Sequence, residues 1–321
     1  MGEIKASPDD FIVEEMLSFI PEGSGEHIFL HIEKRGENTE YVARLLARHA
    51  GVRQRDVSYA GMKDRHGRTS QWFSVWLPGK HDPDWAPVEN ENLKILQTIR
   101  HARKLKRGVL AGNKFRLVIR NWQADPYLAE QQLQQIKMLG FPNYYGDQRF
   151  GRNGQNLNAA MAMFGGAKIR REQRSIYLSA ARSYLFNLIL AERVHSQTWN
   201  QALPGDVFKL AGSNSHFRME SMDSALLERL HSGDIHPTGL LYGKGESGAV
   251  ADVLALEQNI IATHPFLAEG LLKADLESDR RALRAMPENL LWQFSENTLH
   301  LAFDLPAGSY ATALLREIIN T

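Results

Sequence analysis

Apolar and polar residues alternate in four stretches of the chain, as they do in strands that bury one face. In residues 27–33 (HIFLHIE), Ile28, Leu30 and Ile32 lie on one side. Residues 71–77 and 114–120 alternate in the same way, and alternation returns between residues 292 and 303. These stretches are therefore predicted to be strands of a sheet.

Four other segments show the spacing of an amphipathic helix. Residues 38–51 begin with an Asn-Thr cap and end at glycine, and residues 125–140 open with Asp-Pro and also end at glycine. A long helical pattern covers residues 179–197. A last helix is predicted near the C-terminus, with one apolar side formed by Leu314, Leu315, Ile318 and Ile319.

The order of these elements favours the α+β class, with a mixed, largely antiparallel sheet and flanking helices, over a doubly wound sheet. After Gly140 the composition changes to PNYYGDQRFGRNGQ, rich in Gly, Asn and aromatic residues, whereas the last segment resembles the first third of the chain. We therefore predict a discontinuous domain of residues 1–140 and 286–321. A second α+β domain, residues 141–285, is predicted to be inserted into it.

Composition narrows the classes of protein. The chain has 321 residues, of which 43% are hydrophobic, enough for two ordinary domains. It contains no cysteine, which excludes disulfides, thiolate metal sites and cysteine nucleophiles. No apolar run approaches the roughly 20 residues that span a bilayer, and the start MGEIKASPDDF lacks the pattern of a signal peptide. A cytoplasmic protein without a membrane partner is expected.

The net charge is only +1, but the charges are unevenly distributed. Residues 92–124 contain no Asp or Glu and nine basic residues: Lys94, Arg100, Arg103, Lys104, Lys106, Arg107, Lys114, Arg116 and Arg120. In residues 149–182 only Glu172 opposes the basic residues Arg149, Arg152, Lys168, Arg170, Arg171, Arg174 and Arg182. Either stretch alone could be a solvated surface. Together they favour a partner with a phosphate backbone.

The segment YAGMKDRHGRTSQ, residues 59–71, places one carboxylate, Asp64, among Lys63, Arg65 and Arg68. Neighbouring positive charges favour the ionised form of a carboxyl group, and an ionised carboxylate suits a nucleophile. From the residues alone, an aspartate that pairs with surface cations in a loop is the competing interpretation.

This segment resembles the signature GxKDxxxxTxQ around the catalytic aspartate of the TruD family of pseudouridine synthases, with five positions in register: Gly61, Lys63, Asp64, Thr69 and Gln71. Four more segments resemble motifs of that family, in the family's order: residues 5–15 (KxxPxDFxVxE), 112–115 (GNxF), 142–151 (PNYFGxQRFG) and 306–312 (PAGSFAT). Because five motifs match in order over nearly the whole chain, the resemblance is far more specific than any one of them.

The resemblance implies a pseudouridine-synthase-type fold and the isomerisation of uridine to pseudouridine in tRNA, at position 13 of the D arm, without a cofactor or metal. Asp64 would attack either C1′ of the ribose or C6 of the uracil, and the sequence does not decide between them. The glycosidic bond breaks, the uracil turns, C5 joins the ribose and the C5 proton is lost. Lys5 matches the position whose ammonium would pair with Asp64, although a lysine so near the start could also be a surface residue.

Five further residues match positions that the resemblance implies bind the substrate. Phe115 would stack on the uracil, or be only a core residue, and both can hold. Asn113 can offer a donor and an acceptor to the nucleoside, although Asn after Gly often only makes a turn. Phe11 and Tyr310 would touch the nucleotide, although packing alone explains their apolar surroundings, and Tyr310 stands where the motif has Phe. Arg149 would reach a phosphate or form a wall of the cleft.

Other functions have little support in the sequence. There is no phosphate-loop motif and no paired-histidine metal motif, and no second carboxylate is marked near Asp64 as a retaining glycosidase would need. The main alternative is an RNA-binding module or RNA chaperone on the same fold, without catalysis. The presence of Lys5, Asp64 and Asn113 together argues against it. The expected enzyme is a monomer whose partner is tRNA.

Overall fold

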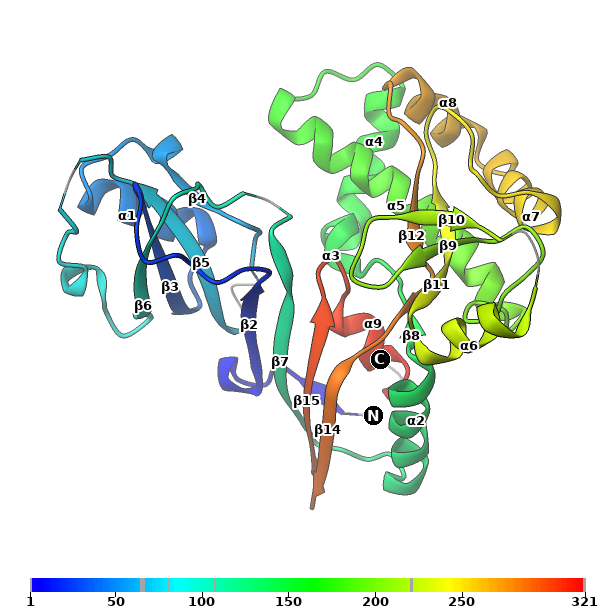
Figure 1. Ribbon diagram of the computed structural model, residues 1–321, viewed down its shortest axis with the longest axis horizontal. Coiled ribbons are helices and arrows are strands. Elements are labelled where there is room, and N and C mark those ends of the chain that lie inside the picture. Colours follow the sequence, from blue (N-terminus) through cyan, green and yellow to red (C-terminus); the bar gives the residue numbers. More distant parts are fainter. Residues whose placement is uncertain (1, 64–66, 80, 107, 220–221, 320–321) are drawn as a thin grey trace. The chain divides into compact units, whose positions relative to one another are not determined.

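The computed structural model describes residues 2–63, 67–79, 81–106, 108–219 and 222–319. The chain forms two compact units (Figure 1). The first unit consists of Met1–Gln131, Pro287–Gly308 and Ile319–Thr321. The second unit consists of Gln132–Met286 and Ser309–Ile318.

The first unit is built on a nine-stranded sheet. Its strands are β1 (Glu3–Ile4), β2 (Phe11–Leu17), β3 (His27–Arg35), β4 (Val57–Tyr59), β5 (Arg68–Trp76), β6 (Leu93–His101), β7 (Leu110–Arg120), β14 (Glu288–Ser295) and β15 (Thr298–Pro306). The order across the sheet is β14-β15-β7-β2-β5-β3-β6, with β1 beside β7 and β4 beside β5. β2 and β5 run parallel, and the neighbouring pairs β2–β7 and β3–β5 are antiparallel. The predicted mixed, largely antiparallel sheet is confirmed.

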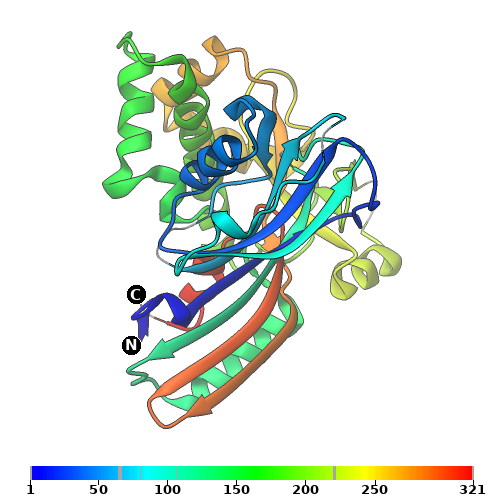
Figure 2. The same cartoon turned by 90° about the vertical axis from the view of Figure 1, so that its left-hand side faces the viewer.

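The strand patterns read from the sequence are confirmed with wider bounds. Residues 27–33, 71–77 and 114–120 fall largely within β3, β5 and β7. The alternating stretch between residues 292 and 303 is two strands rather than one, because it turns after Ser295 and returns as β15. This hairpin pairs with β7, so the C-terminal part of the chain completes the sheet begun by the N-terminal part (Figure 2).

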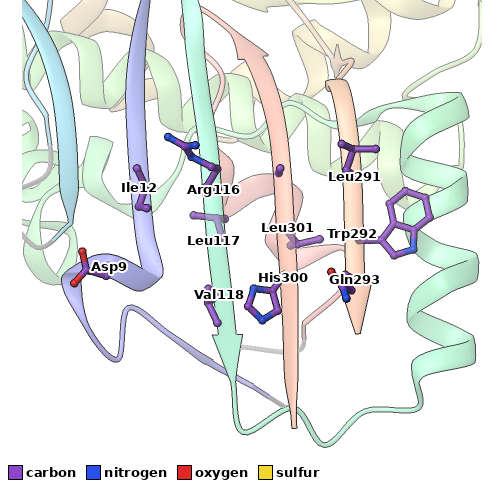
Figure 3. A pocket seen from close by; sticks show the side chains of 11 residues that line it. Asp9, Ile12, Arg116, Leu117, Val118, Leu291, Trp292, Gln293, His300 and Leu301 are labelled. Atoms are coloured by element: carbon purple, nitrogen blue, oxygen red, sulfur yellow. The ribbon is translucent and has the colours of Figure 1, made fainter. Parts of the chain in front are cut away.

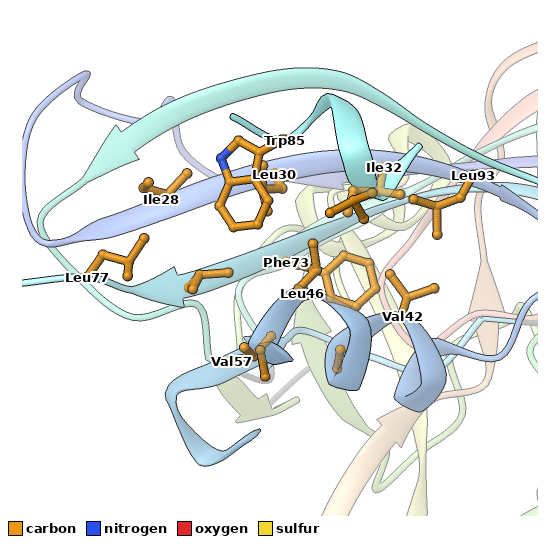
Figure 4. Close-up of a cluster of buried hydrophobic side chains, with 14 residues drawn as sticks. Ile28, Leu30, Ile32, Val42, Leu46, Val57, Phe73, Leu77, Trp85 and Leu93 are labelled. Carbon is orange, nitrogen blue, oxygen red and sulfur yellow. The ribbon is translucent and has the colours of Figure 1, made fainter. Parts of the chain in front are cut away.

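Helix α1 (Thr39–His49) covers one face of this sheet. Its N-cap is Asn38, whose side chain accepts a hydrogen bond from the backbone N–H of Glu40 at 2.8 Å. Val42 and Leu46 of the helix pack with the apolar residues of β3 and β5, and all of them are buried (Figure 4). Each such side chain contributes roughly 1.5–3 kcal/mol to folding, so this packing fixes the sheet on which the site residues lie. Short 3-10 turns, η1 (Pro8–Asp10), η2 (Gln54–Asp56) and η3 (Ala86–Val88), complete the unit.

Helix α2 (Pro126–Leu139) begins in the first unit and continues into the second. It starts as predicted after Asp125, whose side chain accepts from the backbone N–H of Tyr127 at 2.9 Å. It ends at Gly140, which has a φ of +78°. A Cβ at this position would lie 2.5 Å from the carbonyl oxygen of Ala285, so no larger residue fits there.

The second unit contains both helices and small sheets. Its helices are α3 (Asp147–Phe150), α4 (Gln155–Phe164), α5 (Arg171–His195), α6 (Ser224–Ser232), α7 (Ala251–Ala262), α8 (Pro265–Lys273) and α9 (Ala311–Arg316), with the 3-10 turn η4 (Arg152–Gly154). A four-stranded sheet has the order β10-β9-β11-β12, and its strands are β9 (Val207–Leu210), β10 (His216–Arg218), β11 (Ile235–Leu241) and β12 (Asp279–Ala282). Two further strands, β8 (Phe141–Pro142) and β13 (Arg284–Ala285), pair with each other.

Two predicted helices of this part differ in length from the structure. The helix expected over residues 179–197 begins earlier, at Arg171, because its exposed first turns carry charges rather than the apolar spacing used for the prediction. The last helix ends at Arg316, before Ile318 and Ile319, yet both isoleucines are buried. Apolar spacing therefore predicted the burial of these residues correctly but overestimated the length of the helix.

Candidate active site

The candidate residues fall into both units. Lys5, Phe11, Asn113 and Phe115 belong to the first unit, and Arg149 and Tyr310 belong to the second. The predicted nucleophile, Asp64, lies outside the described residues, together with Arg65 and His66. The residues on either side of these three, Lys63 and Gly67, are described.

Strands β2 and β7 bring Phe11, Asn113 and Phe115 to one face of the sheet. The two strands are antiparallel, and their register pairs Val13 with Phe115 and Glu15 with Asn113. Side chains of directly paired residues lie on the same face, and alternate residues of a strand share a face. Phe11, Glu15, Asn113 and Phe115 are therefore neighbours, although they come from two motifs about 100 residues apart.

The aromatic residues on this face form a layer. The ring of Phe115 stacks on Phe303 of β15 with centroids 5.2 Å apart, and Phe11 meets Phe115 edge to face at 6.4 Å. Phe11 and Phe115 are 5% and 7% exposed. Both are thus core residues, which is one of the two roles considered from the sequence.

Lys5 lies against this layer. Its ammonium is 4.2 Å from the centre of the Phe11 ring, a cation–π contact. Its backbone φ is +62°, a conformation that residues other than glycine rarely adopt. The backbone between β1 and η1 therefore takes up strain at the residue that directs this ammonium over the aromatic layer.

A buried polar network that sequence reasoning missed lies beside the aromatic residues. The ammonium of Lys63 is 2.8 Å from Oε1 of Glu15 and donates a hydrogen bond to Oδ1 of Asn113 at 2.7 Å. The other oxygen of Glu15 accepts from the backbone N–H of Trp72 at 2.9 Å. The side chain of Glu15 is fully buried, and burial raises its pKa while the ammonium of Lys63 opposes that rise. The sequence held one signal for this network: Glu15 is an acidic residue on the same side of its strand as the apolar residues Phe11 and Val13.

The loop before residue 64 is held by side chains of the same motif. The side-chain amide of Gln71 donates to the carbonyl oxygen of Gly61 at 2.5 Å. The hydroxyl of Thr39, the first residue of α1, accepts from the backbone N–H of Lys63 at 3.3 Å and donates to Oε1 of Gln71 at 3.0 Å. Thr69 is completely buried. Gly61, Lys63 and Gln71 of the motif thus help to hold the loop in place, and Thr69 is part of the buried interior.

After residue 66 the chain passes close to β2. A Cβ at Gly67 would lie 2.6 Å from the carbonyl oxygen of Phe11, so glycine is required there. Arg68 of β5 is paired with Ile12 of the parallel strand β2. Its guanidinium forms ion pairs with Asp9 at 3.1 Å and with Glu33 at 3.4 Å. Two of the three cations grouped with Asp64 in the sequence, Lys63 and Arg68, therefore have other carboxylate partners.

The candidate residues of the second unit contact each other. Nε of Arg149 donates to the hydroxyl of Tyr310 at 3.0 Å, and another guanidinium nitrogen donates to Ser179 at 2.8 Å. The same guanidinium lies 5.1 Å from the ring centre of Tyr145. A Cβ at Gly146 would lie 2.7 Å from the hydroxyl oxygen of Thr312, so the PNYYG and PAGSYAT segments pack tightly. The hydroxyl that distinguishes Tyr310 from the Phe of the motif is used to bind Arg149.

A shallow pocket of about 320 Å³ opens elsewhere on the first unit (Figure 3). Residues lining it include Ile12, Arg116, Gln293 and His300, most of them on the sheet face opposite Asn113 and Phe115. None of the candidate residues that the structure describes lines this pocket. The pocket is therefore separate from the candidate active site.

Among the described residues, no group of three His, Asp or Glu residues is placed to hold a metal ion. No helix among the described residues is both long and apolar enough to cross a membrane.

Comparison with known proteins identifies first the fold and then the family. A solved structure from Methanosarcina mazei, which carries the provisional name tRNA pseudouridine synthase D (TruD), superposes with a TM-score of 0.73 over 100% of this chain and 94% of that one, at 22% identity. The fold is therefore shared with that structure. The model of the family tRNA pseudouridine synthase D (TruD) matches residues 1–161 and 154–318. The chain belongs to the TruD family.

Relatives at higher identity agree with this assignment. A protein named tRNA pseudouridine synthase D from Methylococcus capsulatus is 47% identical, and the match covers 99% of this chain and 91% of the relative. A protein of the same name from Nitrosococcus oceani is 48% identical, with 99% and 90% covered.

Proposed function

We propose that this protein is a tRNA pseudouridine synthase that isomerises uridine, by resemblance uridine 13 in the D arm, with Asp64 as the nucleophile. Membership of the TruD family and the names of the relatives support the activity. The observation that carries the proposal is the arrangement on the face of β2 and β7. Lys63, the residue before Asp64, is held there by Glu15 and Asn113, next to the aromatic layer.

This arrangement suits the proposed chemistry. Isomerisation needs no redox agent, because the uracil leaves C1′ and returns to it through C5, with loss of the C5 proton and gain of a proton at N1. The nucleophile must be ionised and shielded from water. The ammonium of Lys5 over the ring of Phe11 supplies a positive charge beside an apolar layer, which favours an anion there. Attack on C1′ and attack on C6 are both compatible with these residues.

The remaining substrate contacts are proposals of the same kind. Phe11, Asn113 and Phe115 would bind the target nucleotide in the first unit, which would act as the catalytic domain. Arg149 and Tyr310 of the second unit would bind substrate close to their mutual hydrogen bond. We keep the predicted bounds of 1–140 with 286–321 for the catalytic domain and 141–285 for the inserted domain as a proposal. The enzyme would act as a cytoplasmic monomer without a cofactor.

The two basic stretches are proposed to bind the tRNA backbone. In the second unit Lys168, Arg170, Arg171 and Arg174 are all exposed around the start of α5. Contacts of lysine and arginine to phosphates release counterions, so binding should weaken steeply as salt rises.

The substitution Asp64→Asn tests the proposal. The amide has nearly the same shape but is not a nucleophile, so the variant should bind a tRNA transcript like the wild type and form no pseudouridine. Asp252→Asn, an exposed position in the first turn of α7, is the matched control and should keep full activity. Turnover by Asp64→Asn above a small fraction of wild type would contradict the proposal. Binding without pseudouridine by the wild type would favour the non-catalytic RNA-binding module.

A further inference from the structure

The contacts of Lys63 determine how the amide of Asn113 is oriented. The ammonium lies between Oε1 of Glu15 and Oδ1 of Asn113, at 2.8 and 2.7 Å. An ammonium has three N–H donors and no acceptor, so only the oxygen of an amide can face it favourably. The Asn113 amide therefore turns its oxygen toward Lys63 and its nitrogen away.

The amide nitrogen of Asn113 is the group left for a ligand. It carries two donors and no acceptor. Within residues 2–63, 67–79, 81–106, 108–219 and 222–319 it makes no hydrogen bond. Asn113 is only half-buried and lies on the face that carries Phe11 and Phe115.

The backbone under Asn113 is held rigidly. A Cβ at Gly112 would lie 2.1 Å from the carbonyl oxygen of Leu305, so β7 and β15 approach too closely for another residue. Asn113 itself is paired in register with Glu15 on one side and Leu305 on the other. With the backbone fixed, rotation of the side-chain amide is the freedom that remains, and Lys63 removes it.

We propose that Glu15 and Lys63 are positioning residues that hold Asn113 as a hydrogen-bond donor toward an acceptor oxygen of the target uridine. This inference rests on the proposed function and adds the direction of the hydrogen bond. The acceptor would be O2 or O4 of the uracil or the 2′-oxygen of the ribose. Glu15 neutralises Lys63, so the lysine orients the amide rather than offering its charge to the RNA.

The burial of the pair supports this role. The side chains of Glu15 and Lys63 are 0% and 10% exposed, so neither is placed to bind a phosphate. Burial raises the pKa of Glu15, and the nearby ammonium counteracts it. An apolar pair would pack as well at this position, but it would leave the Asn113 amide free to rotate and exchange its oxygen and nitrogen.

Substrates that each lack one strong acceptor would test the inference. We would use tRNA transcripts with 2′-deoxyuridine, 2-thiouridine or 4-thiouridine at the target position and measure single-turnover rates. Sulfur is a weaker acceptor than oxygen, and the deoxy sugar lacks the 2′-oxygen. For each protein, the penalty is the rate with unmodified tRNA divided by the rate with the analogue. For one of the three analogues this penalty should be roughly tenfold larger in wild type than in Asn113→Ala, which is about the effect of one hydrogen bond.

Three variants separate the donor from its positioning pair. Asn113→Ala should show no extra penalty for that analogue. The double variant Glu15→Gln with Lys63→Met leaves no unpaired buried charge, and its extra penalty should fall to about threefold or less, since the amide can turn. Lys63→Arg should keep the wild-type pattern, because a guanidinium also has donors only. The circular dichroism spectrum should be unchanged in all three variants.

Each result decides a part of the inference. Equal penalties in wild type and Asn113→Ala, for all three analogues, would overturn the donor assignment. A wild-type pattern in the double variant, or loss of the pattern in Lys63→Arg, would overturn the positioning role. If wild type does not isomerise unmodified tRNA, the proposed function fails and this inference with it, whereas an active wild type with equal penalties contradicts this inference alone.

Discussion

Two groups of charged residues lie on opposite faces of the sheet near β2, and they differ in burial. The inner pair, Glu15 and Lys63, is 0% and 10% exposed and joins the candidate active site. The outer cluster consists of Asp9, Glu33, Arg35 and Arg68, with distances between 2.6 and 3.4 Å. In the outer cluster Arg35 and Asp9 are 47% and 46% exposed.

The contrast shows that distance alone does not measure the importance of an ion pair. An exposed pair has little net effect on stability because water already solvates both charges. A buried pair also contributes little in total, but removing one partner leaves a charge without solvent or partner, which is costly. We therefore expect the inner pair to be the sensitive one, although the distances in the outer cluster are similar.

The largest effect is expected from Lys63→Met. It leaves the carboxylate of Glu15 buried and unpaired, and should lower the free energy of unfolding by about 3 kcal/mol at neutral pH. Denaturation in urea would measure this. Adding Glu15→Gln should recover most of the loss, and Lys273→Met, a lysine that is 78% exposed, is the control. A loss below about 1 kcal/mol in the single variant would show that the inner pair is no more sensitive than a surface pair.

The same variant gives a pH dependence with a defined sign. Burial raises the pKa of Glu15 above its ordinary value of 4.5, and loss of Lys63 removes the effect that opposes the rise. The folded protein then holds a proton that the unfolded chain releases, so stability falls as pH rises above 4.5 and recovers as pH falls toward it. Urea denaturation of Lys63→Met across that range should show this slope, and the double variant should not. A flat profile in the single variant would contradict it.

An intermediate effect is expected from Asp10→Asn, in the last residue of η1 before β2. Asp10 is 2% exposed and accepts two hydrogen bonds from Arg120, at 2.8 and 2.7 Å. These bonds, more than any other cause, lower the pKa of Asp10. The ionised Asp10 therefore stabilises the folded protein above pH 3.8, and this stabilisation is lost as pH falls further. Arg120 is half exposed, so we expect a loss of only about 1 kcal/mol at neutral pH. A loss that persists undiminished at pH 3 would refute the electrostatic explanation.

The smallest effect is expected from Asp9→Asn in the outer cluster. Its two arginine partners are partly exposed, so the free energy of unfolding should change by no more than about 0.5 kcal/mol, and less at high salt. Single-turnover activity should stay close to wild type. A loss as large as that of Asp10→Asn would remove the distinction between the two groups.

The sequence was informative wherever a contact is local or periodic. Alternation predicted β7, which buries one face, and it also located β3 and β5, although both faces of these two strands are buried. The caps of α1 and α2 were recognised because Asn38 and Asp125 bind backbone groups two residues on. The motifs also identified Phe11, Asn113 and Phe115, which the pairing of β2 and β7 brings to one face.

Contacts between distant residues could not be predicted in the same way. The network of Glu15, Lys63 and Asn113 joins three motifs, and only the register of two strands shows that they meet. Arg68 is four residues from Asp64 in sequence, but it shares the register of Ile12 and binds Asp9 and Glu33. The site roles of all the candidate residues remain predictions: Lys5, Phe11, Asp64, Asn113, Phe115, Arg149 and Tyr310.

Formation of pseudouridine in tRNA by the purified protein is the decisive test of its function. Purified protein would be incubated with an unmodified tRNA transcript that carries uridine at position 13 of the D arm, and pseudouridine would be mapped by carbodiimide labelling and primer extension. We expect one new modified position, position 13 of the tRNA, and no modification of a parallel transcript that carries cytidine there. A tRNA that is bound by the protein while all its uridines stay unchanged would contradict the proposed function.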